Sequence, residues 1–365
     1  MGFVFSAAEC VVEKARAKHD ITNTAVAGCV TGASISAKEM SSTTEKPELV
    51  CVTGGSGCIG SWLVHLLLLR GYSVHATVQN LKDENETKHL EALEGADARL
   101  RLFQIDLLDY DSIAAAVSGC AGVFHVASPC IVDPVEDPER DLLDPAIKGT
   151  INVLTAAKEA GVQRVVVTSS ISAMIPNPNW PANVAINEEC WTDINYCKQK
   201  GLWYSVSKTL AEKATWDFAK EKGLDVVVIN PGTVMGPVFP PRINASMQML
   251  LKLLKGCNET FEDVFIGVVH FKDVALAHIL VYENKSATGR HFCAEAIAGY
   301  SDYAAKVAEL FPQYEVPRSI EDTQPGLVRT KDGGNKLMKL GLEFIPMEQI
   351  LKDAVEDLKK KGYIS

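Results

Sequence analysis

The stretch ELVCVTGGSGCIG at residues 48–60 decides the fold class. Residues 48–53 form a short apolar, β-branched run typical of a buried strand, and a helical stretch, 61–70, follows the glycines. The spacing predicts a dinucleotide-binding turn: Gly54 permits the sharp turn, Gly57 leaves room for a pyrophosphate, and Gly60 lets the helix pack closely. The helix N-terminus offers free N–H groups to the phosphates. The alternative is a purely structural glycine turn.

Strand-like and helix-like segments alternate beyond this turn. The predicted strands are residues 73–78, 100–105, 122–126, 164–168 and 225–230, and the predicted helices between them are 142–160 and 204–222. This order predicts an α/β fold with a doubly wound parallel sheet (Rossmann). Ligands of such sheets bind at the carboxyl ends of the strands.

We expect three parts in the chain: a flexible N-terminal extension (1–46), a dinucleotide-binding Rossmann domain (47–233) and mainly a smaller substrate-binding lobe (234–365). The extension is rich in Ala, Ser and Thr, with a short helix expected at 7–18, and is a poor secretory signal. In the lobe, prolines break the alternation. Its expected helices are residues 242–255, 274–282, 303–310 and 347–361.

Composition excludes several classes of protein. The 365 residues carry a net charge of −10, which argues against a nucleic-acid partner because such proteins need a basic face. The longest apolar stretch, 62–69, is far shorter than the roughly 20 residues of a membrane span. Ten scattered cysteines without metal-ligand spacing predict no metal site and a reduced, cytoplasmic protein.

The second predicted strand ends in Gln79-Asn80, where a site that prefers NAD often carries an acid. No acid follows directly, so a 2′-phosphate would not be repelled, and Lys82 and Lys88 lie close enough in sequence to help bind it. This favours NADP(H) as the cofactor. The alternative, that both lysines are solvated surface residues, stays open.

Three residues fit carbonyl reduction. Tyr204 and Lys208 lie four apart on one helix face, and Ser170 follows the strand at 164–168. Hydride transfer to a carbonyl carbon develops charge on oxygen, which the Ser170 hydroxyl can stabilise. Tyr204 would then supply the proton, with its pKa lowered by Lys208 and the oxidised nicotinamide. The alternative is an ordinary Tyr–Lys helix pair.

From about residue 49 to its C-terminus the chain resembles the extended short-chain dehydrogenases/reductases, and more narrowly the plant cinnamoyl-CoA reductase and dihydroflavonol reductase group. The matching motifs are residues 53–60, 106–107, 123–129, 148–150, 168–170, 189–193, 204–208, 230–232, 244–246 and 272–278. The resemblance implies that Ser170, Tyr204 and Lys208 are the catalytic residues. The cofactor-binding residues expected on this basis are Thr53, Gly54, Gly57, Cys58, Ile59, Gly60, Gln79, Lys82, Asp106, Leu107, Ala127, Ser128, Lys208, Pro231, Gly232 and Val234.

The sequence also departs from that group. Met249 and residues 299–300 replace a histidine and a His-Arg pair associated with the CoA end of the substrate. Gln79 replaces the arginine that binds NADPH, and Ser205 replaces a cysteine that could pair with Cys197. A phenolic aldehyde or ketone is therefore as credible a small-molecule substrate as a CoA thioester. We expect a monomer or weak homodimer.

Two other functions use the same features. A nucleotide-sugar epimerase or dehydratase shares the fold but usually has an acid after the second strand, where Gln79 stands. A non-catalytic redox sensor that binds NADP(H) would tend to lose the Tyr204–Lys208 pair, which is intact. Both alternatives make turnover of a carbonyl substrate the deciding observation.

Overall fold

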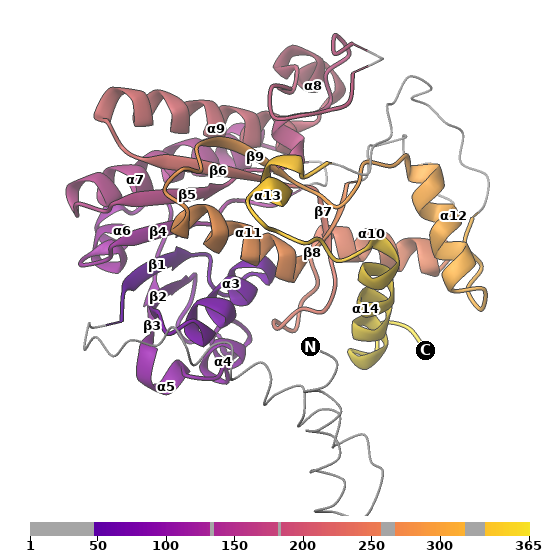
Figure 1. Ribbon diagram of the computed structural model, residues 1–365, viewed down its shortest axis with the longest axis horizontal. Helices are drawn as coiled ribbons and strands as arrows, with labels where there is room; N and C mark the ends of the chain where they lie inside the picture. Colours follow the sequence, from indigo (N-terminus) through magenta and orange to yellow (C-terminus); the bar gives the residue numbers. More distant parts are fainter. Residues whose placement is uncertain (1–46, 132–134, 182–183, 257–266, 318–332) are drawn as a thin grey trace, which may run out of the picture. The chain divides into compact units, whose positions relative to one another are not determined.

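A seven-stranded sheet forms the framework of residues 47–365 in the structure, a computed structural model (Figure 1). The strand order is β3-β2-β1-β4-β5-β6-β9, and every neighbouring pair is parallel. The strands are β1 (Leu49–Thr53), β2 (Ser73–Val78), β3 (Leu100–Gln104), β4 (Gly122–His125), β5 (Arg164–Thr168), β6 (Val226–Pro231) and β9 (Gly289–Cys293). The predicted doubly wound parallel sheet is confirmed.

The structure describes residues 47–131, 135–181, 184–256, 267–317 and 333–365. Residues 47–365 form one compact unit. The helix predicted at 7–18 lies outside the described residues.

The alternation of side chains along the strands divides the core into two layers. Val50 and Val52 belong to the cluster under one helical layer, whereas Cys51 belongs to the cluster under the other. Successive strand residues point to opposite faces, so a strand covered on both sides is apolar throughout. The covering helices are α3 (Cys58–Leu69) and α11 (Phe271–Glu283) on one face, and α6 (Tyr110–Val117), α7 (Asp144–Glu159) and α9 (Trp203–Lys222) on the other.

The part of the chain after residue 233 contributes a strand and a helix to this layered sheet. Strand β9 pairs with β6, with Val227 opposite Gly289, and α11 packs on α3. Helix α11 begins at Phe271, earlier than predicted, because the His270 ring accepts the backbone N–H of Lys272 at 2.9 Å and caps the helix. The domain boundary at residue 233 stays a prediction.

The remaining elements surround this framework. Two short parallel strands, β7 (Thr233–Met235) and β8 (Val268–His270), form a second sheet. The other helices are α4 (Glu84–Glu91), α5 (Ala96–Arg99), η1 (Glu139–Leu143), η2 (Ile171–Ala173), α8 (Ile194–Lys200), α10 (Ala245–Leu254), α12 (Tyr300–Leu310), α13 (Asn335–Lys339) and α14 (Met347–Lys360). Among the described residues, no helix is long and apolar enough to cross a membrane, and no group of three or more His, Cys, Asp or Glu is arranged to hold a metal ion.

Candidate active site

The glycine turn joins β1 to α3 at the carboxyl edge of the sheet. Gly54 adopts a positive φ of 69°, which L side chains rarely tolerate, and Gly57 caps the helix. Two hydrogen bonds tie the turn to β2: the Gly54 N–H donates to the Thr77 hydroxyl and the Gly55 N–H to the Thr77 carbonyl, both at 2.9 Å. The first turn of α3, which includes Cys58 and Ile59, thus presents its N–H groups at this edge.

The other two glycines of the fingerprint differ in what surrounds them. A Cβ on Gly60 would lie 2.0 Å from the Gly54 carbonyl oxygen, so the helix packs against the turn itself. A Cβ on Gly57 would meet only that same oxygen, at 3.3 Å, and Gly57 is exposed. Gly57 is therefore accessible from solvent, as a phosphate-binding cradle requires.

A buried hydrogen-bond chain holds the end of β4 beside this turn. The Thr53 hydroxyl accepts two backbone N–H groups that follow His125, each at 3.1 Å, so its own hydrogen goes to His125 Nδ1 at 2.9 Å. The Thr150 hydroxyl donates to a backbone carbonyl of α7 at 2.7 Å and so accepts from His125 Nε2 at 3.1 Å. His125 is thus neutral with its proton on Nε2, and burial lowers its pKa to about 3.

This chain places Ala127 and Ser128 opposite the glycine turn. A Cβ on Gly54 would lie 2.9 Å from the backbone N and Cα of Ala127. Because β1 and β4 lie on either side of the point where the strand order reverses, this crevice is the expected ligand position of a doubly wound sheet.

The end of β2 carries an acid that the sequence did not predict there. The Glu86 carboxylate, from the first turn of α4, accepts the backbone N–H of Gln79 at 2.7 Å and that of Asn80 at 3.4 Å. The same Oε2 atom accepts the Ser56 hydroxyl at 3.3 Å. The expectation that no acid stands near Gln79 is therefore wrong, because the helix after the strand folds back over the strand end.

The two lysines expected near a 2′-phosphate do not gather there as a pair. Lys88 forms an ion pair with Glu84 at 2.5 Å on the exposed side of α4. Lys82 is exposed, and its backbone N–H donates to the Asn80 side chain at 3.0 Å. The spacing Asp83-x-x-Glu86 is that of a helix start, and it was the available signal that α4 begins here.

Ser170, Tyr204 and Lys208 come together at the ends of β5 and α9. Ser170 follows β5, and its side chain lies close enough to Tyr204 to lower the pKa of the Tyr204 hydroxyl. Lys208 lies one helical turn after Tyr204, is buried, and donates from Nζ to the Thr168 carbonyl at 2.9 Å. Cys130 Sγ lies 4.0 Å from the Tyr204 hydroxyl. The structure thus brings the three residues together at this edge, and their catalytic role stays a prediction.

Burial dominates the proton equilibria of this group. It raises the pKa of Tyr204 well above its ordinary value, and the neighbouring Cys130 adds to the rise, while the hydrogen bond with Ser170 opposes it. Burial lowers the pKa of Lys208 to about 8, against the opposing charges of Cys130 and Glu212. The lowering of the Tyr204 pKa expected from the sequence also invoked the oxidised nicotinamide and stays a prediction.

A buried ion pair behind these residues was missed at the sequence level. Glu212, one turn after Lys208, accepts from the Ser169 hydroxyl at 2.6 Å, from the Asn230 amide at 2.9 Å and from Arg290 Nε at 2.6 Å. Asn230 also donates to the Ser170 carbonyl at 3.3 Å. In the sequence, the only sign that Glu212 belongs to this group was its regular spacing with Tyr204 and Lys208. Its partner Arg290 gave no such sign, since it comes from the distant strand β9.

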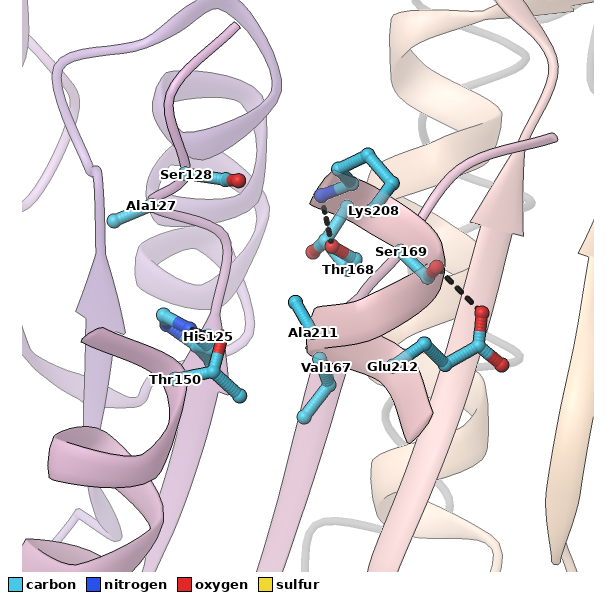
Figure 2. Close-up of a pocket in the computed structure, with 10 residues that line it drawn as sticks. All are labelled: His125, Ala127, Ser128, Thr150, Val167, Thr168, Ser169, Lys208, Ala211 and Glu212. Carbon is cyan, nitrogen blue, oxygen red and sulfur yellow. Dashed lines mark hydrogen bonds between the residues drawn. The ribbon is translucent and has the colours of Figure 1, made fainter. Parts of the chain in front are cut away.

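A small cavity of about 10 Å³, the room of about one water molecule, lies between the two groups (Figure 2). In Figure 2, Ala127 and Ser128 face Lys208 and Thr168 across it. Its lining residues are His125, Ala127, Ser128, Thr150, Val167, Thr168, Ser169, Lys208, Ala211 and Glu212.

The other predicted cofactor residues lie along the same edge. Asp106 is exposed after β3, while Leu107 is partly buried and its carbonyl accepts the Asn152 amide at 2.9 Å. Pro231 is buried at the end of β6, and a Cβ on Gly232 would lie 1.9 Å from a neighbouring carbonyl oxygen. Val234 is only 5% exposed and its side chain belongs to the core, so only its backbone remains to meet a ligand.

The chain matches the NAD dependent epimerase/dehydratase family over residues 50–293. A second match, to the Tim17/Tim22/Tim23/Pmp24 family, spans residues 1–61 and overlaps the glycine turn. The second match covers a small part of the chain, and most of it lies outside the described residues.

Similar proteins include plant and fungal reductases. The chain is 46% identical to cinnamoyl-CoA reductase 1 of Petunia hybrida over 318 residues, which is 87% of this chain and 94% of that protein. It is 39% identical to tetraketide alpha-pyrone reductase 1 of Arabidopsis thaliana, over 87% of this chain and 97% of the relative. The crystal structure of vestitone reductase from alfalfa is 33% identical, with a TM-score of 0.73, over 87% of this chain and 99% of that one. Yeast methylglyoxal/isovaleraldehyde reductase Gre2, complexed with NADPH, is 26% identical with a TM-score of 0.74, over 87% and 100% of the two chains.

Proposed function

Because the chain belongs to the cinnamoyl-CoA reductase-like group of the NAD dependent epimerase/dehydratase family, the extended short-chain dehydrogenases/reductases, we propose that this oxidoreductase reduces the carbonyl group of a phenylpropanoid-type small molecule. The observation that carries the proposal is the assembly of Ser170, Tyr204 and Lys208 at the sheet edge that also holds the glycine turn. The candidate substrates are a phenolic CoA thioester, aldehyde or ketone.

The residues at the sheet edge fit a nicotinamide dinucleotide. Gly57 is exposed, and Gly54 and Gly60 have no room for side chains. A bound NAD(P)H supplies the hydride for the carbonyl carbon. The turn and the N-terminus of α3 would hold the pyrophosphate, and Lys208 would bind the ribose next to the nicotinamide.

The chain's own residues would handle the oxygen and its proton. The Ser170 hydroxyl would donate a hydrogen bond to the developing oxyanion, and Tyr204 would transfer its proton to complete the alcohol. The effect of Ser170 on the pKa of Tyr204 supports a position of the two side chains beside each other. Lys208, fixed by the Thr168 carbonyl, supplies positive charge beside Tyr204.

In the lobe, the positions that depart from the family pattern show little that could bind CoA. Tyr300, at one of these positions, is fully buried, and its ring packs 5.8 Å from that of Tyr303. Met249 packs against the same core. Aldehydes and ketones therefore stay beside CoA thioesters among the proposed substrates.

The proposed setting is the cytoplasm, and the proposed state is a monomer or weak homodimer. The seven cysteines in the described ranges are all free thiols, which suits a reducing compartment.

The test is consumption of NADPH or NADH by purified protein against a panel of phenolic CoA esters, aldehydes and dihydroflavonols. We expect at least one substrate to be turned over, and the Tyr204→Phe variant to lose that turnover while it still binds cofactor. Cofactor binding without turnover of any substrate would contradict the reductase and favour the redox sensor.

A further inference from the structure

The Glu86 carboxylate closes the gap between the glycine turn and the end of β2. Its Oε2 atom meets Ser56 on one side and the backbone N–H groups of Gln79 and Asn80 on the other. In a doubly wound sheet, the adenosine ribose of a dinucleotide lies at this place, beyond the first glycine turn and the second strand. Glu86 thus stands where the cofactor's 2′ position would lie.

We propose that Glu86 determines cofactor choice in this protein by accepting a ribose hydroxyl and opposing a 2′-phosphate, so that NADH is preferred over NADPH. The proposal rests on the nucleotide site proposed above. All three described contacts fall on Oε2, so Oε1 can accept a further hydrogen bond. A carboxylate that accepts from ribose hydroxyls is the usual partner of NAD, whereas a 2′-phosphate needs cationic partners.

The segment of the chain around Glu86 is acidic. Gln79 supplies a neutral amide at the strand end, and residues 79–91 contain four acids against two lysines. Lys88 is paired with Glu84. Arg101, on the neighbouring strand β3, stacks on the Phe103 ring with its guanidinium carbon 4.8 Å from the ring centre. A doubly charged phosphate at this place would therefore meet a carboxylate first.

The backbone contacts also show what a phosphate would have to displace. The N–H groups of Gln79 and Asn80 and the hydroxyl of Ser56 are donors that could bind an anion, and the Glu86 carboxylate occupies them. NADPH would have to compete for these donors and move Glu86 aside. This reverses the preference for NADPH that was expected from the sequence. That expectation rested only on the residues directly after the strand.

The direct test measures the affinities of NADH and NADPH by titration calorimetry for the wild type and Glu86→Gln, without any substrate. The glutamine keeps an oxygen for the Gln79 N–H and removes only the charge. We expect the wild type to bind NADH more tightly, and Glu86→Gln to raise the affinity for NADPH relative to NADH by about tenfold or more. Because the repulsion is screened by ions, the wild-type discrimination should also weaken as salt is raised.

Glu91→Gln is the matched control, since it removes the same charge from the exposed end of the same helix. It should leave the ratio of affinities unchanged, and both variants should keep the wild-type melting temperature. A wild type that binds NADPH more tightly, or a ratio that Glu86→Gln does not change, overturns the proposal and leaves Glu86 as a structural brace. Binding of neither cofactor by the wild type would overturn the nucleotide site itself, and with it both proposals.

Discussion

At the scale of single residues, Tyr204 and Lys208 divide the work of proton transfer. Burial keeps Tyr204 a neutral phenol, because it raises the pKa well above the ordinary value. A proton donor must hold its proton until the oxyanion forms, and a raised pKa keeps the proton on Tyr204 until then. Lys208, with its pKa lowered to about 8, is the group of the pair that titrates first as the pH rises.

Replacing Tyr204 with phenylalanine removes the proton donor and keeps the ring. We expect kcat to fall by roughly 10²–10⁴-fold, with little change in cofactor affinity. Ser170→Ala should lose less, because it removes one hydrogen bond to the oxyanion and leaves the proton source. Steady-state rates on a verified substrate, with cofactor titrations in parallel, check this. Near-normal turnover by Tyr204→Phe would contradict the mechanism.

The charge of Lys208 predicts a pH limit that differs from one set by Tyr204. We expect kcat/KM to fall above about pH 8, where the buried ammonium loses its proton. Glu212→Gln, which removes a charge that raises this pKa, should move the fall to lower pH. A pH profile that stays flat to the alkaline end would show that the charge of Lys208 is not needed.

The same titration has a consequence for stability with a definite sign. Since burial lowers the pKa of Lys208 from 10.5 to about 8, the unfolded chain binds more protons between these values. The contribution of Lys208 to the free energy of unfolding therefore rises with pH in this window. Lys208→Met should remove that rise, as denaturant unfolding at several pH values would show.

At the scale of elements, the glycines of the turn have different roles: one serves cofactor binding and another serves the packing of the fold. Gly57 leads into α3 with an extended backbone (φ −73°, ψ 167°) that any residue can adopt, and it is exposed. Gly60 has no room for a side chain, because its Cβ would lie 2.0 Å from the Gly54 carbonyl oxygen. Two glycines of one motif should therefore fail in different ways.

We expect Gly57→Val to abolish dinucleotide binding and to leave the fold largely intact, because the side chain stands where the pyrophosphate would lie. Gly60→Ala should instead lower the free energy of unfolding by about 1–3 kcal/mol through the forced shift of the turn. Calorimetric cofactor titration and denaturant unfolding of both variants separate the two effects. Unchanged cofactor affinity in Gly57→Val would refute the assignment of the turn.

The ion pair between Glu212 and Arg290 joins α9 to β9 across the catalytic strand end. Arg290 also donates to the carbonyls of Glu188 and Cys190 at 2.9 and 2.5 Å, and its guanidinium lies 3.9 Å from the centre of the Trp191 ring. Arg290→Met would leave the Glu212 carboxylate buried with fewer donors. We expect a loss of about 3–5 kcal/mol in the free energy of unfolding. A loss well below this in denaturant unfolding would show that the pair is not needed.

At the scale of the whole molecule, residues 47–365 contain the complete sheet, both core layers and every candidate site residue. We therefore expect a variant that lacks residues 1–46 to keep the melting temperature and the cofactor affinity of the full chain. Thermal unfolding and calorimetry on the two forms check this. A truncated chain that does not fold would show that the extension is part of the folding unit.

The sequence by itself determined the local features of this protein. The turn at Gly54, the strands of the dinucleotide-binding half and the Tyr204–Lys208 face follow from backbone conformation and from periodicities of two and 3.6 residues, which act over short distances. Ser170 was predictable for a related reason, since parallel strands end on the same edge.

Only the tertiary structure decided which distant groups meet. Glu86 reaches Gln79 because α4 folds back over β2, and Arg290 reaches Glu212, 78 residues away, because β9 pairs with β6. Neither contact follows from a periodic pattern in the sequence, since each depends on how a helix packs or on which strand lies at the sheet edge. These placements are set by burial of the whole core, and they decide the charge around the cofactor and the support of the catalytic residues.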